Sequence, residues 1–187
     1  MREILLANTD RAVLLWPIFE CHVLDLAMHL NKHVRFQAVK MLNGTVQAMM
    51  QEAIDPRHKD KARTHAITYK MIRSLYELSV NDHVEVRQRV AESVLSIIQS
   101  SGQLLHYDSS HVPLDALSSL DEEDHVIAAW KLVLKFLDQT VLHLDLDLVP
   151  VTFKTLDIIC ADFLAQFPAK LLAELIRTIG RYADGSR

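Results

Sequence analysis

The sequence predicts an all-α protein built as a solenoid, in which antiparallel helix pairs stack in a row. The first observation is a sequence pattern that occurs twice, in residues 24–42 and 75–95. It consists of an apolar helical stretch, a polar break, a Val-Arg pair and a second amphipathic helix. The second is the helical period of apolar residues along the chain. The third is the scarcity of helix breakers, since the chain has only four glycines and five prolines. Such self-similarity is typical of stacked helical hairpins that cannot bury their apolar faces alone.

The first clear repeat is expected at residues 18–53. Pro17 fits the first turn of its first helix, where a missing N–H costs nothing. Asn31 lies in the polar break, and a long second helix follows it. Because Pro56 prevents helical continuation, we interpret residues 55–60 as an inter-repeat loop.

The second clear repeat is expected at residues 61–100. Leu75 and Leu78 mark the apolar face of its first helix, and the Asn81-Asp82 break is expected to cap its second helix. Gly102 stands where glycine commonly follows a helix end.

Two degenerate repeats are expected at residues 121–149 and 150–184, after an irregular loop at 102–120. Residues 143–150 alternate like a strand, but a lone strand without a pairing partner is not stable, so this run is interpreted as an extended connector or the tail of a helix. Pro150 and Pro168 are expected to open the last two helices. In the final helix the inward residues are expected to be Leu172, Leu175 and Ile179.

Composition and charge exclude several classes of protein. A net charge of −4 argues against nucleic-acid binding, which usually needs a basic excess. No apolar run approaches the ~20 residues of a membrane span, and the amino terminus does not read as a signal peptide. Cys21 and Cys160 lie in apolar helical runs, which predicts buried thiols of a reducing compartment. We therefore expect a cytoplasmic protein.

Paired amphipathic helices with a polar turn followed by Val-Arg resemble HEAT repeats. The resemblance is good over residues 18–100, and over 101–187 only the helical pairing persists. It implies a right-handed α-solenoid of HEAT type with about four repeats in one domain, residues 1–187. In that family an arginine early in the second helix ties adjacent repeats together through acidic neighbours. Arg35 and Arg87 hold those places here.

A narrower resemblance rests on Leu14 to Leu42, LLWPIFECHVLDLAMHLNKHVRFQAVKML, and on the closing run LLAELIRTIGRYADGSR. Both resemble the region downstream of the exchange domain in large Arf guanine-nucleotide exchange factors, closest to their exchange-silent Golgi relatives of the monensin-sensitivity type. The resemblance implies a fragment of a longer protein, acting as a non-catalytic scaffold in Golgi and endosome trafficking. Its implied partners are proteins, such as a small GTPase or other trafficking factors. An adaptor in nuclear transport or chromosome organisation stays open as an alternative.

The strongest charge feature is a basic run in the first inter-repeat loop. It predicts contact with an acidic partner or with the anionic cytosolic leaflet of a Golgi or endosomal membrane. The alternative is a solvated turn, because interspersed aspartates dilute the charge. The candidate contact residues are Arg57, Lys59, Lys61 and Arg63.

The histidines invite a metal interpretation that their spacing does not favour. His29 and His33 are four residues apart, but the polar break is expected to place them on different helices. Two imidazoles would also leave a zinc shell incomplete. Asp145 and Asp147 have no identifiable partner acid or base. The remaining cluster of possible ligands lies in the irregular loop and comprises His106, Asp108, His111 and Asp115.

No nucleophile or phosphate-binding loop is identifiable, since the serines occupy no strand-to-helix elbow and the glycines are scattered. The sequence therefore predicts no catalytic residue, no cofactor and no metal. An enzyme that uses the 102–120 loop is the remaining alternative.

Trp16 and Trp130 lie on apolar stripes and are expected to anchor the core. Both ends of the chain are rich in apolar residues, in the stretches 13–19 and 171–179. Exposed apolar patches of several hundred Å² usually mark an interface. The sequence therefore also predicts self-association.

Overall fold

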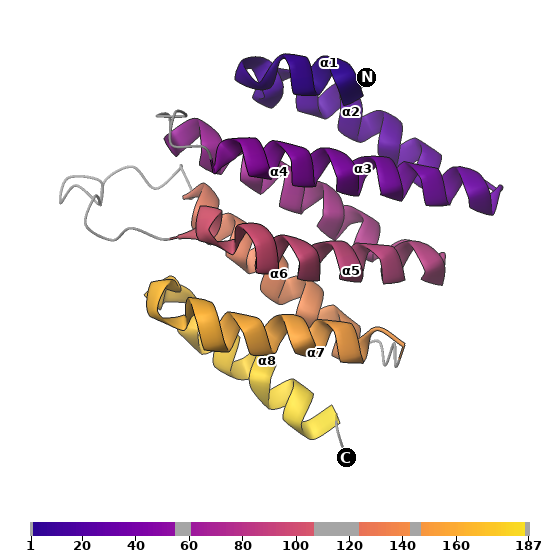
Figure 1. The fold of residues 1–187 in the computed structure, drawn as a ribbon. Helices are drawn as coiled ribbons and strands as arrows, with labels where there is room; N and C mark the ends of the chain where they lie inside the picture. The colour runs from indigo at the N-terminus through magenta and orange to yellow at the C-terminus, as the bar shows by residue number, and fades with distance from the viewer. Residues whose placement is uncertain (1, 55–60, 107–123, 143–146, 186–187) are drawn as a thin grey trace.

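The computed structural model describes residues 2–54, 61–106, 124–142 and 147–185, and every regular element in those ranges is a helix (Figure 1). The all-α prediction is confirmed for this part of the chain. The α-helices are α1 (Arg2–Ala7), α2 (Ala12–Ala27), α3 (Lys32–Ala53), α4 (Lys61–Ser79), α5 (Val84–Ser101), α6 (His125–Leu142), α7 (Val149–Ile158) and α8 (Leu172–Gly185). Five short helices join them: η1 (Thr9–Arg11), η2 (Gly102–Leu105), η5 (Ile159–Phe163), η6 (Leu164–Gln166) and η7 (Ala169–Leu171).

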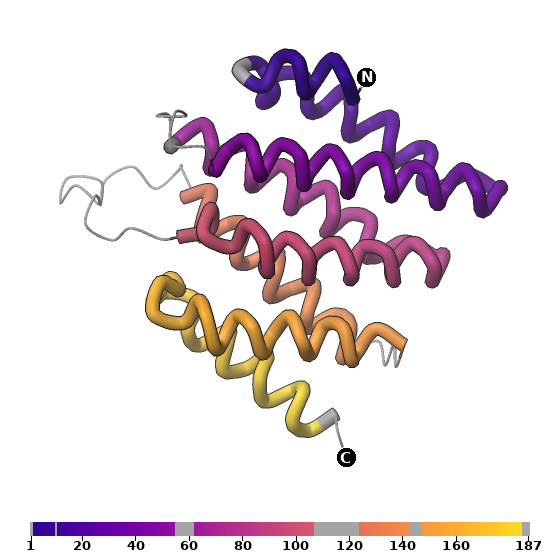
Figure 2. Tube along the Cα trace, in the orientation of Figure 1, coloured from indigo at the N-terminus to yellow at the C-terminus, as the bar shows by residue number. Residues whose placement is uncertain are grey.

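The helices form two layers. The even-numbered helices α2, α4, α6 and α8 contact one another in succession, and α3, α5 and α7 do the same in the other layer (Figures 1 and 2). Successive helices also pack across the layers, α2 on α3, α4 on α5 and α6 on α7. The two ends of the chain therefore lie at opposite ends of the stack (Figure 2). The handedness and the HEAT-type pairing stay predictions.

Both tryptophans anchor the core, as predicted. Trp16 is 0% exposed and Trp130 is 1% exposed. Each indole N–H has a partner, because Trp16 Nε1 donates to Ser74 Oγ at 2.9 Å and Trp130 Nε1 donates to Leu105 O at 2.8 Å. A buried indole that satisfies its N–H adds a large apolar area without an unpaired donor.

The prediction for the start of α2 is wrong. The helix begins at Ala12, so Pro17 lies inside it and not in its first turn. Proline removes the hydrogen bond to the carbonyl four residues earlier. Pro17 lies on the exposed side of α2, where water can reach the backbone. The short helix α1 before it was also not predicted.

The inward face of α8 is only partly the predicted one. Leu175 is buried as predicted, but Leu172 and Ile179 are 37% and 40% exposed, so their inward assignment is wrong. Tyr182 is buried instead, and its hydroxyl donates to Leu137 O at 3.1 Å. The apolar residues of α8 form one stripe, and packing covers only the edge of that stripe that carries Leu175 and Tyr182, so the sequence period alone does not fix the rotation of the helix.

Three predicted connectors lie outside the described residues in whole or in part. They are the loop at 55–60, most of the 102–120 loop and the first residues of the 143–150 run. In the described parts of these segments, Gly102–Leu105 form η2 directly after α5. The helix α7 begins at Val149, with Pro150 in its first turn as expected.

Candidate interaction surface between α3 and α5

Arg35 joins the turn before α3 to the start of α5. The side chain is almost buried, at 7% exposure. Its Nη1 donates to His29 O at 2.8 Å and to Leu30 O at 2.9 Å, so it holds two carbonyls of its own turn. Its Nε donates to Glu85 Oε1 at 3.1 Å, and its Nη2 pairs with the same oxygen. One guanidinium thus connects two helix pairs.

Local sequence explains why Arg35 reaches this position. Asn31 is the N-cap of α3, and its side-chain oxygen accepts a hydrogen bond from His33 N at 2.8 Å. This capping interaction begins the helix at Lys32 and places Arg35 in its first turn, beside the preceding carbonyls. The planar guanidinium then offers several donors in fixed directions, which lysine does not.

The electrostatics of the joint favour the ionised carboxylate. The hydrogen bond from Arg35 is the main cause that lowers the pKa of Glu85 below its ordinary value. A hydrogen bond from Glu85's own backbone acts in the same direction. Such charge-assisted hydrogen bonds are stronger than neutral ones. The pair is therefore ionised at neutral pH.

Arg87 occupies the equivalent place at the start of α5. Its Nη1 donates to Asn81 O at 2.8 Å and to Asp82 O at 3.2 Å. Both arginines therefore contact the carbonyls five and six residues earlier, which is the same local geometry. The structure places both predicted arginines in matching positions, while their ladder role stays a prediction.

Asn81 has a role different from the predicted cap. The N-cap of α5 is His83, and Asn81 lies two residues before it, 6% exposed. Its side-chain oxygen accepts from His83 N at 2.9 Å, while its Nδ2 donates to Ala27 O at 3.3 Å. Asn81 therefore links the end of α2 to the turn before α5. The position of Asn81 in a polar break of the sequence did not predict this long-range contact with Ala27.

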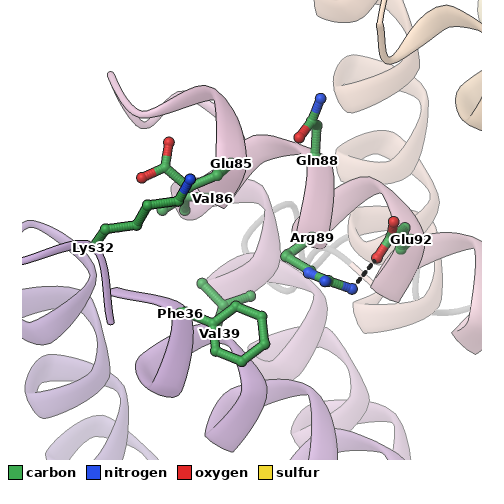
Figure 3. A pocket seen from close by; sticks show the side chains of 8 residues that line it. All are labelled: Lys32, Phe36, Val39, Glu85, Val86, Gln88, Arg89 and Glu92. Carbon is green, nitrogen blue, oxygen red and sulfur yellow. Dashed lines mark hydrogen bonds and ion pairs between the residues drawn. The ribbon is translucent and has the colours of Figure 1, made fainter. Parts of the chain in front are cut away.

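A groove lies beside the joint, between α3 and α5 (Figure 3). One hollow has a volume of about 340 Å³, and an adjoining one has about 200 Å³. The two share the residues in the middle of the groove. The first is lined by Lys32, Phe36, Val39, Glu85, Val86, Gln88, Arg89 and Glu92, and the second adds Lys40, Asn43 and Ser93.

The middle of the groove combines an aromatic ring with positive charge. The Phe36 side chain is 38% exposed, and the guanidinium carbon of Arg89 lies 5.2 Å from its ring centroid. This geometry is a cation–π contact. Arg89 Nη1 also pairs with Glu92 Oε2 at 2.8 Å (Figure 3). An apolar surface flanked by oriented charges is typical of a protein-binding site.

Two lysines at the groove are exposed and without a counter-ion. Neither Lys32 nor Lys40 makes an ion pair with another residue in the described ranges. Asn43 Oδ1 is buried and has no hydrogen-bond partner among those residues. One turn beyond Asn43, Gln47 Nε2 donates to Ser96 Oγ at 2.8 Å and joins α3 to α5. Sequence reasoning missed the groove, although Lys32, Phe36 and Lys40 recur every four residues.

The other predicted candidates stand as follows. Arg57 and Lys59 lie outside the described residues, Lys61 begins α4, and Arg63 is half-buried on it. The membrane or partner contact of this basic run therefore stays a prediction.

The histidines do not come together in the described ranges, where no group of three or more potential metal ligands occurs. His33 lies within α3, but His29 lies in the turn before it and not on the preceding helix as predicted, so the two do not share a helix face. His106 is exposed at the edge of the described region, and the other three members of the loop cluster lie outside it.

The prediction of buried cysteines is wrong for one of the two. Cys21 is exposed, because it lies on the outer face of α2 with Leu14 and Ile18. Cys160 is half-buried, and burial is the main cause that raises the pKa of its thiol. Separately, none of the helices in the described ranges is long and apolar enough to cross a bilayer.

Comparison with known proteins supports the narrower resemblance. The chain is 24% identical over 180 residues to the protein MON2 homolog of Drosophila melanogaster, a match that covers 96% of this chain. It is 23% identical over 177 residues to the MON2 homologs of Homo sapiens and Xenopus laevis, covering 95% of this chain. The match spans only 9% of the length of each relative. No family model and no solved structure matches. The resemblance to proteins of the monensin-sensitivity type is thus confirmed over nearly the whole chain.

Proposed function

We propose that this chain is a non-catalytic scaffold of HEAT type for protein–protein interaction in Golgi and endosome trafficking, linked to regulation of Arf-family GTPases. The observation that carries the proposal is the surface between α3 and α5, where the Arg35 joint supports an open groove with exposed charged and aromatic side chains. A repeat protein commonly presents such a surface to its partners.

The two-layer arrangement supports the HEAT assignment. Helices alternate between the layers, and two first-turn arginines hold equivalent carbonyls. The proposal is a right-handed solenoid with clear repeats at 18–53 and 61–100 and degenerate repeats at 121–149 and 150–184, in which Arg35 and Arg87 act as the repeat ladder. The similarity to MON2 homologs over 95–96% of this chain supports the trafficking assignment.

The partners in this proposal are proteins, with small GTPases and trafficking factors as the leading class. The chain is proposed to act at the cytoplasmic face of Golgi or endosomal membranes, with peripheral contact through Arg57, Lys59, Lys61 and Arg63. Anionic lipids attract such a basic segment by up to about 1 kcal/mol per residue. Self-association through exposed apolar residues such as Ile4, Leu14 and Ile176 is proposed as well.

Proximity labelling tests the function. The chain, fused to a biotin ligase, is expressed in cells of its source organism beside the ligase alone. We expect enrichment of Golgi and endosome trafficking proteins, because partners held at the surface lie within labelling range. Enrichment of nuclear-transport or chromosome proteins would instead support the alternative adaptor role, and labelling equal to that of the ligase alone would contradict a scaffold role.

A further inference from the structure

We propose that the groove between α3 and α5 binds an extended peptide that carries two acidic residues four positions apart and an apolar residue midway between them. The proposal rests on the scaffold function and names the class of partner segment that the surface accepts. Its basis is the side-chain pattern of the groove (Figure 3).

The groove side of α3 carries a basic–aromatic–basic stripe. Lys32, Phe36 and Lys40 are four residues apart, a spacing that keeps them near one another on one side of a helix. The two lysines are exposed and the Phe36 ring is 38% exposed, so all three are open to a ligand. With a rise of 1.5 Å per residue, the lysine positions are about 12 Å apart along α3.

An extended peptide matches this spacing. Alternate residues of an extended chain point to the same side, and each residue advances the chain by about 3.3 Å. The first, third and fifth residues of a peptide therefore share one side, and the first and fifth are about 13 Å apart. Carboxylates at the first and fifth positions can face Lys32 and Lys40, and an apolar side chain at the third can contact Phe36.

The charge balance selects an acidic ligand. Glu85 is engaged by Arg35, and Glu92 is engaged by Arg89, so both carboxylates at the groove are neutralised by a partner. Lys32 and Lys40 then contribute positive charge without a counter-ion in the described part of the chain. A single exposed ion pair contributes little, so the selection comes from two charges and one apolar contact acting together.

Asn43 adds a polar side chain to the wall of the second hollow. Its Oδ1 is buried without a hydrogen-bond partner in the described ranges, and its side chain lines the second hollow. Buried carboxamides are usually satisfied by protein, water or ligand. Since Oδ1 is closed off from solvent, a peptide in the groove can contact only the amide nitrogen of this side chain, which can donate to a backbone carbonyl.

The groove also limits the length of the bound segment. The residues that line the two hollows extend along α3 from Lys32 to Asn43, and the Gln47–Ser96 hydrogen bond joins α3 to α5 one turn further on. From Lys32 to Asn43 the helix advances about 16 Å, which corresponds to roughly five extended residues. A short linear segment of a partner fits this length.

Fluorescence anisotropy with the whole 187-residue chain tests the proposal. The probe is a labelled peptide Ser-Asp-Ser-Phe-Ser-Asp-Ser, and the comparison peptides replace both Asp by Asn or replace Phe by Ser. We expect the parent peptide to bind at least about tenfold more tightly than either, since each loses part of the match. Raising salt from about 0.05 to 0.5 M should weaken binding, because exposed charges are screened.

Matched charge reversals locate the site. The variant Lys32→Glu/Lys40→Glu should lose at least about tenfold in affinity for the acidic peptide, because attraction becomes repulsion at both ends. The control Lys135→Glu/Lys170→Glu changes the net charge equally at exposed positions outside the groove and should bind as the wild type does. Circular dichroism confirms that both variants fold.

Three results would overturn the proposal. They are no binding of the parent peptide up to about 1 mM protein, equal losses in the two charge-reversal variants, and binding to anionic phospholipid vesicles that depends on Lys32 and Lys40 while the peptide does not bind. None of them bears on the proximity labelling, so failure of the groove assignment and failure of the scaffold function are distinguishable.

Discussion

The joint between α3 and α5 is polar, whereas the joint between α6 and the segment that follows α7 is aromatic. In the first, Arg35 bridges two carbonyls and Glu85. In the second, the Trp130 ring centroid lies 4.9 Å from that of Phe167 and 6.3 Å from that of Phe163. A polar joint needs particular donors and acceptors at fixed positions, so it produces a recognisable motif in the sequence. An aromatic joint needs only complementary shape, so it produces no such motif.

The polar residues at the start of α5 are not repeated at the start of α7, where Pro150 and Thr152 take their places. They occupy the second and fourth positions of α7, which Glu85 and Arg87 occupy in α5. Thr152 is 0% exposed, and its hydroxyl donates to Leu148 O at 3.0 Å, within its own first turn. The third helix of this layer therefore has neither the arginine nor the acidic residue of the earlier pattern.

Removing the aromatic anchor should have the largest effect. Trp130→Ala should lower the free energy of unfolding by about 3–5 kcal/mol, because it leaves a cavity between α6 and the Phe163–Phe167 rings. Phe153→Ala is a control at a side chain that is 55% exposed and should cost much less. Urea unfolding followed by circular dichroism measures both, and equal losses would contradict the anchor role.

The tight packing of Gly102 against the Phe163 ring predicts a smaller loss of stability. A Cβ at Gly102 would lie 2.3 Å from the Phe163 ring, so Gly102→Ala should destabilise by about 1–3 kcal/mol through overpacking. At Gly180, within α8, a Cβ would meet nothing within 4 Å. Gly180→Ala should therefore stabilise the protein by up to about 1 kcal/mol. Thermal melts of the two variants give the comparison, and a stabilised Gly102→Ala protein would refute the close contact.

The polar joint should respond to acid through Glu85. Because the pKa of Glu85 lies below its ordinary value of 4.5, its contribution to stability is present at neutral pH. It is lost as pH falls through the lowered folded-state pKa. The difference in denaturation midpoint between wild type and Glu85→Gln should therefore be constant above about pH 6 and shrink toward pH 3. A difference that does not change with pH would mean that the charge of Glu85 is not engaged.

The reactivity of the two cysteines compares the N-terminal and C-terminal halves of the chain without changing the sequence. Cys21 on α2 should react with a maleimide at least about tenfold faster than Cys160, which is half-buried and whose pKa is raised chiefly by burial. Mass spectrometry of the alkylated peptides over time measures both rates. Equal rates would show that the outer face of α2 is covered in solution.

The sequence predicted the fold class and the local place of the arginines because both depend on short-range pattern. Helical periodicity identified the helices, and the Val-Arg pairs marked the first turns of α3 and α5. The contacts of Asn81 with Ala27 O and of Arg35 with Glu85 join residues about fifty positions apart, and no local pattern encodes such pairings.

The errors have related physical causes. Pro17 was placed at a helix start because proline favours that position, although α2 tolerates it on an exposed face. Cys21 and Ile179 were assigned to the core because they are apolar, but the rotation of each helix is decided by its packing partners. The groove was missed because it exists only where α3 and α5 meet.

The joint at Arg35 supports the surface proposed to bind partners, and one measurement tests it directly. Free energies of unfolding are compared for Arg35→Ala, Arg87→Ala and Arg73→Ala, the last being an exposed arginine paired with Glu77. Arg35→Ala should cost about 2–3 kcal/mol, since two carbonyls and a carboxylate lose their donor, and Arg87→Ala should cost at least about 1 kcal/mol, since two carbonyls lose theirs. Arg73→Ala should stay within about 0.5 kcal/mol of wild type. If Arg35→Ala is no more destabilising than Arg73→Ala, the guanidinium does not hold the two helix pairs together.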